Sequence, residues 1–237
     1  KWFIGSCYFV CGNRYSDQVV WDEFMAQEFL NTIIFYRNEF TTAETNFAFQ
    51  ENRNGQSLFE YMSYFLHEYK RLLIVRIDLK IKLEFANTVN IEVFNNFMNN
   101  LRDALGRKRG CFEHLRGHAW AIEQSVDSGG LHCHLLLVYN GDRHQNDWYL
   151  AETVGQLWVK LTGGMGWYYN CNTTENKRVY ERLGTLGIGM IHRDEILEVN
   201  NAINAALYLT RPDKYEQRLK AWSPSMRSCG RGTISKR

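Results

Sequence analysis

The feature of this sequence that most narrows its fold is a strict alternation of apolar and charged residues between Val75 and Glu84. The apolar members are Val75, Ile77, Leu79, Ile81 and Leu83, and the charged members are Arg76, Asp78, Lys80, Lys82 and Glu84. Successive side chains point to opposite faces of a strand, so this period of two predicts a strand with one buried face. The chain therefore needs a sheet with a layer packed against it.

The pattern after this strand changes repeatedly between helical and strand periods. Helices are expected over residues 91–105, 147–161 and 194–210, and strands over 117–125, 131–139, 166–170 and 186–192. The turn residues Asp127-Ser128-Gly129-Gly130 predict a hairpin between the second and third strands. This order predicts an α+β fold, in which helices pack on an antiparallel sheet.

The flanking parts of the chain have a different character. Residues 1–70 show helical spacing of apolar residues, which predicts a helical N-terminal extension, with a polar loop at 51–57. The α+β domain is expected over residues 71–213 and a basic tail over residues 214–237. The first residue is Lys1 rather than an initiator methionine, which predicts a trimmed fragment.

Positive charge is concentrated near the C-terminal end. From Arg211 onward there are eight basic and two acidic residues, so this segment carries +6 and the remainder −4. Such a segment suits the phosphate backbone of a nucleic acid, although a solvated tail has the same composition. No apolar stretch approaches the ~20 residues that cross a bilayer. The six scattered cysteines fit reduced thiols, so a cytoplasmic protein with no membrane partner is expected.

The strongest chemical signal is the segment His132-Cys133-His134 in the third expected strand. Alternate side chains of a strand share a face, so both imidazoles point the same way. A tight hairpin turn places Glu123 opposite His132 on that face. Two imidazoles and a carboxylate then form an open site for a divalent cation such as Mg²⁺ or Mn²⁺. A slip of one residue would bring in Gln124 instead, and two histidines on a partly exposed strand are the alternative interpretation.

The last expected helix carries a candidate nucleophile. Asn201, Asn204, Tyr208 and Arg211 lie on a polar stripe beside the apolar stripe of this helix. A tyrosine beside the core stripe, with an arginine one turn further, is the arrangement that a phosphotyrosine mechanism needs. A half-buried tyrosine that anchors the helix is the other interpretation.

Five segments follow one another in an order that matches a known family. They are Val75-Arg76-Ile77-Asp78-Leu79, Ala119-Trp120-Ala121-Ile122-Glu123-Gln124, Gly130-Leu131-His132-Cys133-His134-Leu135-Leu136-Leu137, Tyr208-Leu209-Thr210-Arg211 and Arg227-Ser228-Cys229-Gly230-Arg231-Gly232. Together they resemble the core of the inovirus gene-2-type replication proteins in the HUH endonuclease superfamily. The resemblance covers residues 70–232 of the chain.

The resemblance implies that residues 71–213 form an HUH-type nicking domain with a ferredoxin-like catalytic core. It makes His132, His134 and Glu123 the ligands of Mg²⁺ or Mn²⁺. It makes Tyr208 the nucleophile, which cuts one DNA strand and stays attached to the new 5′ end as a phosphotyrosine.

Two further residue roles follow from the same comparison. The family usually has lysine where this chain has Arg211, which puts proton transfer at that position in doubt, so Lys214 is a second candidate for the basic catalytic position. Asp78 is expected either to orient one histidine from behind or to be an ordinary surface residue.

The implied function is initiation of rolling-circle replication of a phage or plasmid in the cytoplasm of a bacterial host. The expected partners are single-stranded or hairpin DNA at a replication origin and a host helicase or replication machinery. The candidate DNA-binding residues are Arg107, Lys108, Arg109, Arg227 and Arg231.

Three other functions fit the same residues. A single-tyrosine transposase or a conjugative relaxase uses the same chemistry for another task. A non-catalytic nucleic-acid-binding module needs no metal. A metal-dependent phosphodiesterase attacks with water and leaves no protein–DNA adduct.

Overall fold

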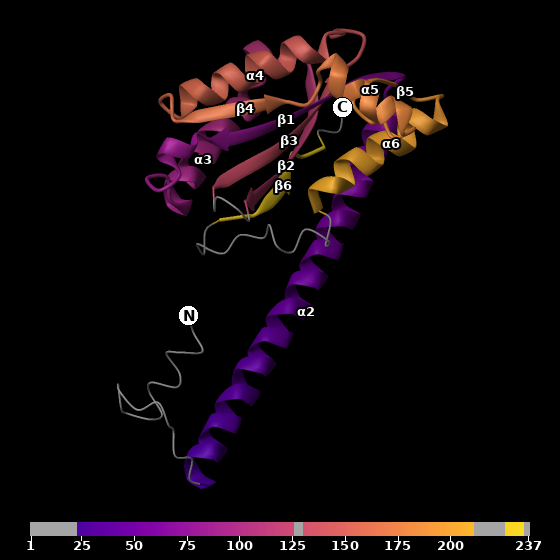
Figure 1. Ribbon diagram of the computed structural model, residues 1–237. Helices are drawn as coiled ribbons and strands as arrows, with labels where there is room; N and C mark the ends of the chain where they lie inside the picture. Colours follow the sequence, from indigo (N-terminus) through magenta and orange to yellow (C-terminus); the bar gives the residue numbers. More distant parts are fainter. Residues whose placement is uncertain (1–22, 126–129, 211–225, 235–237) are drawn as a thin grey trace. The chain divides into compact units, whose positions relative to one another are not determined.

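The computed structural model of this chain describes residues 23–125, 130–210 and 226–234. The chain divides into two compact units, residues 1–50 and residues 51–237. The boundary falls before residue 70 because residues 58–66 bury apolar side chains in the core of the second unit. Figure 1 shows the chain coloured along its sequence.

Helix α2 (Glu23–Glu68) begins in the first unit and ends in the second. In the first unit it exposes several large apolar side chains, among them Ile34, Phe35 and Phe49. The polar stretch 51–57 is helical, so the expectation of a loop there was wrong. Asn52, Asn54, Gly55 and Ser57 have weak helix preferences, but Leu58 and the buried residues that follow it hold this end of the helix on the sheet.

The sheet of the second unit has six strands, and every described pair of strands is antiparallel. The strands are β1 (Arg71–Ile81), β2 (Leu115–Gln124), β3 (Leu131–Asn140), β4 (Gly166–Asn170), β5 (Gly189–His192) and β6 (Cys229–Arg231). Their order is β4-β1-β3-β2-β6, and β5 also pairs with β1 (Figure 1).

Helices and short 3-10 turns connect these strands. The helices are α3 (Ile91–Arg107), α4 (Asp147–Leu161), α5 (Thr174–Arg182) and α6 (Ile196–Leu207). The turns are η1 (Leu83–Phe85), η2 (Gly110–Phe112) and η3 (Tyr208–Thr210). This arrangement confirms the predicted α+β fold, an antiparallel sheet with helices packed on it and a helix at the N-terminal side.

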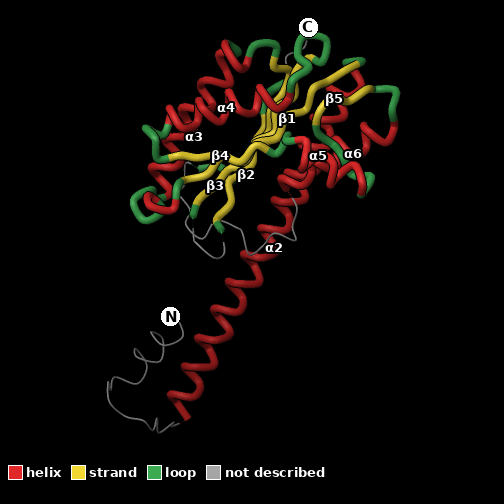
Figure 2. Tube along the Cα trace, turned by 45° about the horizontal axis from the view of Figure 1, so that its top comes forward, coloured by secondary structure: helices red, strands yellow, loops and turns green. Residues whose placement is uncertain are grey.

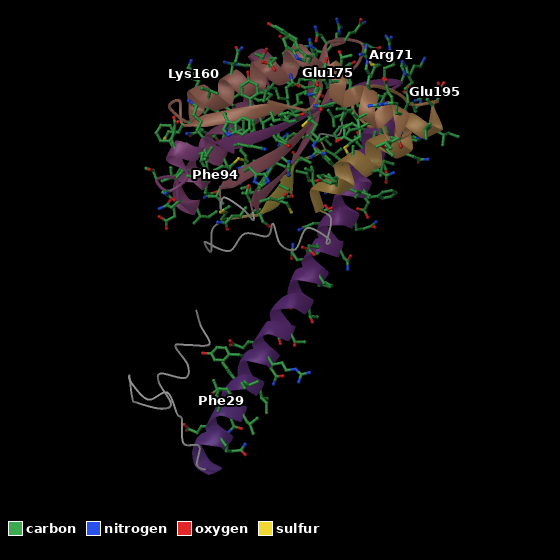
Figure 3. The ribbon with its side chains drawn as sticks, in the orientation of Figure 1. Phe29, Arg71, Phe94, Lys160, Glu175 and Glu195 are labelled. Atoms are coloured by element: carbon green, nitrogen blue, oxygen red, sulfur yellow. The ribbon has the colours of Figure 1, made fainter. Side chains whose placement is uncertain are left out.

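One face of the sheet is covered by α3 and α4, which Figure 2 shows beside each other. The alternating apolar residues of β1, including Ile77 and Leu79, pack there with Cys133 and Leu135 of β3. Phe94 of α3, labelled in Figure 3, is fully buried in this layer. The predicted buried face of the first strand, from Val75 to Ile81, is therefore the face that meets α3 and α4. The expectation that Leu83 continues this face was wrong, because β1 ends at Ile81 and Leu83 is exposed in η1.

The opposite face is covered in part by residues 58–66 of α2 and by α6. Gly117 of β2 allows the helix to come close, because a Cβ at this position would lie 2.6 Å from the ring of Phe65. Ala202 and Ala206 are fully buried, and these small residues bring α6 close to the sheet. The polar residues of β1 and β3 lie on this second face.

Strands β4 and β5 share one edge of β1. Strand β4 pairs with Ile77–Ile81 and β5 with Arg71–Ile74, which leaves Arg76 between them. The side chain of Asn172 fills this gap, because its Oδ1 accepts from the Arg76 N–H at 3.1 Å and its Nδ2 donates to the Arg76 carbonyl at 2.7 Å. The backbone of β1 is thus satisfied where no strand pairs with it.

Two elements were not expected from the sequence. Helix α5 buries none of its residues, so it leaves no apolar period to detect. Strand β6 falls in the segment 214–237 that was expected to be a basic tail, yet it pairs with Ala119–Ala121 of β2. Met226 beside it is buried in the core under α3 and α4.

Among the described residues, no helix combines the length and apolar content that a membrane crossing requires.

The burial of His118 on β2 predicts a loss of stability in acid. Burial, with the nearby charge of Lys108, lowers the pKa of His118 from 6.5 to about 4. As the pH falls, His118 therefore takes up a proton at a higher pH in the unfolded chain than in the folded chain. The stability contribution is complete above pH 6.5 and falls as the pH drops toward 4, by about 2 kcal/mol at pH 5.

Urea unfolding at about pH 7.5 and about pH 5 measures this loss. A His118→Gln variant should lose about 2 kcal/mol less than the wild-type chain between the two conditions. Equal losses in the two proteins would contradict the assignment.

Candidate metal centre

The hairpin of β2 and β3 brings three metal-binding side chains together. Glu123 pairs with His132, and Ala121 pairs with His134. The register predicted from the hairpin turn is therefore confirmed, with Glu123 rather than Gln124 on the face of the two imidazoles.

The ligand atoms of Glu123, His132 and His134 all lie within 4.8 Å of one another. The Nε2 atoms of His132 and His134 lie 3.5 Å and 3.1 Å from Oε2 of Glu123. All three residues are buried. Two imidazole nitrogens and a carboxylate oxygen that converge in this way form a donor set that could hold a metal ion.

Asp78 of β1 lies directly behind His134. The two residues are paired in the register of β1 and β3, and Oδ1 of Asp78 lies 2.5 Å from Nδ1 of His134. A carboxylate on Nδ1 turns Nε2 toward Glu123, as the partners of metal-binding histidines commonly do. The structure thus places Asp78 where the sequence analysis expected a residue that orients a histidine.

The charges of this group are coupled. Burial alone would lower the pKa of His134, but the hydrogen bonds and charges of Asp78 and Glu123 outweigh it and raise the pKa. Burial would likewise raise the pKa of Asp78, but its hydrogen bond to His134 and the charges of His134, Arg76 and Lys80 lower it. The group therefore favours a cation beside the two carboxylates, either a proton on His134 or a metal ion.

His132 has a different environment. Its Nδ1 atom is buried and has no hydrogen-bond partner in the part of the chain that the structure describes. Its ring meets the ring of His134 edge to face, with centroids 5.0 Å apart. Its Nε2 atom therefore remains the one that is directed at Glu123.

Tyr208 lies next to this group. It begins η3, directly after α6, and it is half-buried. Its ring meets that of His134 at a centroid distance of 6.2 Å, and the guanidinium of Arg76 lies 4.6 Å from the centroid of the Tyr208 ring. The structure thus brings the expected nucleophile to the expected ligands.

Arg76 is a site residue that the sequence analysis missed. It lies two residues before Asp78 on the same face of β1, and its Nε atom is 3.7 Å from Oδ1 of Asp78. The signal was present in the alternation of β1, which puts Arg76, Asp78 and Lys80 on one face. The alternation gives no information about the end of α6, which places Tyr208 over Arg76.

The other predicted site residues lie apart from this group or outside the described ranges. Arg211 and Lys214 lie outside the described residues. Arg107, Lys108 and Arg109 are exposed at the end of α3, which covers the opposite face of the sheet.

The two C-terminal arginines differ from each other. Arg227 is exposed just before β6. Arg231 is held against α2, with its Nε 2.9 Å from Oγ of Ser57 and its guanidinium 4.8 Å from the centroid of the Tyr61 ring. Arg231 therefore contributes to the packing of β6 and α2.

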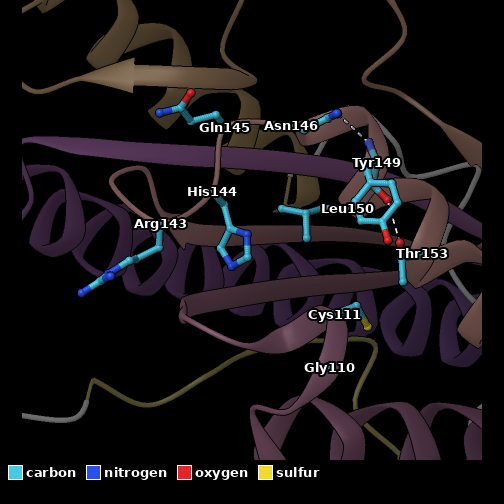
Figure 4. Close-up of a pocket in the computed structure, with 9 residues that line it drawn as sticks. All are labelled: Gly110, Cys111, Arg143, His144, Gln145, Asn146, Tyr149, Leu150 and Thr153. Carbon is cyan, nitrogen blue, oxygen red and sulfur yellow. Dashed lines mark hydrogen bonds between the residues drawn. The ribbon is translucent and has the colours of Figure 1, made fainter.

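A pocket of about 280 Å³ lies beside η2 and the start of α4 (Figure 4). Cys111, His144, Tyr149 and Leu150 contribute to its lining. His144 is already bonded through Nε2 to the carbonyl of Glu113 at 2.9 Å, and burial raises the pKa of the Cys111 thiol to about 11. This pocket belongs to the side of α3 and α4, so it is separate from the Glu123–His132–His134 group.

The fold and this group define an α+β domain whose antiparallel sheet carries a candidate metal centre. Residues 38–231, more than half of the chain, match the family described as the YagK/YfjJ C-terminal domain, and the chain belongs to this family. No curated protein and no solved structure matches the chain.

The geometry predicts that the chain binds a metal ion through the two histidines, and Mn²⁺ is the probe of that binding. In calorimetric titrations, His134→Ala should abolish binding, and Asp78→Asn should weaken it by roughly 10- to 100-fold because the imidazole loses its orienting partner. His192→Ala is the matched control, since His192 pairs with Glu198 at 3.0 Å on a more exposed part of the sheet. Equal Mn²⁺ affinity in wild-type protein and His134→Ala would rule out this centre.

Proposed function

We propose that this chain is a metal-dependent endonuclease of the HUH type, which nicks single-stranded DNA with Tyr208 and rejoins it. The observation that carries the proposal is the position of Tyr208, whose ring lies 6.2 Å from that of His134 in the Glu123–His132–His134 group. A phenol beside a cluster of metal-binding residues combines a nucleophile with a site for phosphate.

Glu123, His132 and His134 are the residues that would hold the cation. Bound there, Mg²⁺ or Mn²⁺ supplies Lewis-acid polarisation of a phosphate oxygen. The donor set supports this choice, since a carboxylate suits both cations and three protein ligands leave further coordination positions for phosphate and water. The task of Asp78 is to keep Nε2 of His134 turned toward Glu123.

In the proposed reaction, Oη of Tyr208 attacks the scissile phosphorus. The bond from Oη to phosphorus forms as the bond from phosphorus to the 3′ oxygen breaks. The phenol gives up its proton, and the departing 3′ oxygen takes one from solvent. One phosphodiester is exchanged for another, so a 3′-hydroxyl can later reverse the reaction and reseal the strand without a nucleotide cofactor.

Arg76 has a separate role in this proposal. Its guanidinium lies over the Tyr208 ring, and its side chain is largely shielded from water. A fixed positive charge there stabilises the negative charge that builds on the phosphate during attack. Lysine cannot reproduce the planar stacking of a guanidinium on an aromatic ring.

The proposed biological setting is initiation of rolling-circle replication of a phage or plasmid in a bacterial host. It rests on the resemblance of five ordered segments to inovirus-type replication proteins. The substrate would be single-stranded or hairpin DNA at an origin, with duplex unwinding left to a host helicase. Arg211, Lys214, Arg107, Lys108, Arg109 and Arg227 are proposed to assist in catalysis or in holding DNA.

Tyr208 is expected to form a covalent adduct with DNA. The wild-type chain, incubated with Mn²⁺ and circular single-stranded DNA that carries its origin, should give a protein–DNA band on a denaturing gel. Tyr208→Phe should give none, because the attacking oxygen is absent, and Tyr149→Phe, which removes an exposed phenol from α4 on the opposite face, should behave as wild type. Cleavage without an adduct would point to attack by water, and an adduct in Tyr208→Phe would reject this nucleophile.

Arg76→Gln should slow adduct formation by roughly 100-fold, the usual cost of losing one group that stabilises transition-state charge. Arg76→Lys should recover part of the rate, because it restores the charge without the planar stacking. Single-turnover rates at saturating Mn²⁺ measure both effects, and Mn²⁺ titration checks that the centre is intact. A wild-type rate in Arg76→Gln with normal Mn²⁺ binding would exclude this role.

A further inference from the structure

Two exposed aromatic residues of β4 lie on the same face of the sheet as the candidate metal centre. Trp167 pairs with Lys80, and Tyr169 pairs with Asp78, so all four side chains share one face. The intervening Tyr168 points to the other face, where its hydroxyl donates to Glu152 of α4 at 2.8 Å. The alternation of β4 thus separates a structural tyrosine from two aromatic rings on the face of the site.

These two rings continue the cross-strand rows that contain the metal ligands. One row runs from Trp167 through Lys80 and His132 to Glu123. The second row runs from Tyr169 through Asp78 to His134. Neighbouring strands lie about 4.8 Å apart, so the backbone of Trp167 is about 10 Å from that of His132.

Both rings are open to solvent and yet held in position. Trp167 is 40% exposed and Tyr169 is 45% exposed. The indole Nε1 of Trp167 donates to the carbonyl of Ile81 at 3.2 Å, and the hydroxyl of Tyr169 donates to Oδ1 of Asn176 at 2.9 Å. Their polar atoms are therefore satisfied within the protein, and the rings are oriented before any ligand arrives.

A positive charge accompanies the rings. Nζ of Lys80 lies 5.0 Å from the centroid of the Trp167 ring, between β4 and the metal ligands. Aromatic rings with a cation alongside form the surface that single-stranded nucleic acid uses, since bases stack on rings and phosphates pair with the cation. Lys80 and the candidate metal centre lie in the same row, and both favour a nucleic acid, which is a polyanion, over a protein partner.

We infer that Trp167 and Tyr169 stack two bases of single-stranded DNA beside the scissile phosphate, while Lys80 neutralises the phosphate between them and the metal centre. The inference rests on the proposed function, because it takes the phosphate at that centre as the point of cleavage. Four nucleotides, the lower end of single-strand binding sites, span about 14 Å, which exceeds the distance from the rings to the centre. The β4 edge would thus set which bases flank the cut.

Binding of a fluorescently labelled oligothymidine to the full chain tests the inference, measured by anisotropy in EDTA so that no cleavage intervenes. Trp167→Ala and Tyr169→Ala should each weaken binding by roughly 5- to 100-fold, and Trp167→Phe should retain most of the affinity because phenylalanine still stacks. Trp148→Ala is the matched control. Trp148 is 49% exposed at the start of α4, the helix on the opposite face, and its loss should leave binding unchanged.

An oligonucleotide with abasic sugars in place of thymidines provides a second measurement that does not depend on any variant. Wild-type protein should bind the abasic oligonucleotide as weakly as the Trp167→Ala/Tyr169→Ala double variant binds oligothymidine. Neither complex contains stacked pairs of a base and an aromatic ring. Equal affinity of the wild type for the two oligonucleotides, or an equal loss in Trp148→Ala and Trp167→Ala, would overturn the inference.

The outcome can be separated from that of the proposed function. If the wild type forms an adduct and Trp167→Ala binds oligothymidine normally, the stacking inference is rejected and the nicking function is supported. If Trp167→Ala binds oligothymidine more weakly and the wild type forms no adduct, base stacking is supported and the nicking function is rejected.

Discussion

The pairing of β2 with β3 is the constraint on which the rest of this molecule depends. Side chains alternate across a strand, so a slip of one residue would move every side chain of β3 to the other face. The register that pairs Glu123 with His132 sends Cys133 and Leu135 into the core under α3 and α4. One choice of register therefore builds both the apolar core and the polar group opposite it. A slipped register would remove apolar side chains from the core and bury polar ones there, and this cost protects the geometry of the site.

The polar side chains on the other face of the sheet can be buried because positive and negative groups alternate among them. Asp78 lies between Arg76 and His134, and His134 lies between Asp78 and Glu123. Burying a lone carboxylate or imidazolium costs several kcal/mol, whereas each charge here has an opposite charge beside it. The same arrangement keeps Nε2 of His134 directed at Glu123, so electrostatic compensation and the orientation of a metal ligand come from one set of contacts.

The sheet leaves this face only partly covered. Residues 58–66 of α2 and the small residues of α6 pack on one portion, whereas the rows that run from β4 to β2 carry polar and aromatic side chains. Strands β4 and β5 share the outer edge of β1, with Asn172 satisfying the backbone between them. This division of the edge brings the exposed rings of β4 into the same rows as the metal ligands and leaves Arg76 under the end of α6.

Local patterns were sufficient for strands β1 to β5, the α+β class and the donor set. The alternation of β1, the His132-Cys133-His134 segment and a tight hairpin are properties of neighbouring residues. Helix α5, strand β6 and the helical course of residues 51–57 escaped detection, since they bury little or draw their stability from distant partners. The meeting of Tyr208 with Arg76 and His134 required the folded chain. These residues are far apart in sequence, and only the packing of Ala202 and Ala206 on the sheet brings the end of α6 above β1 and β3.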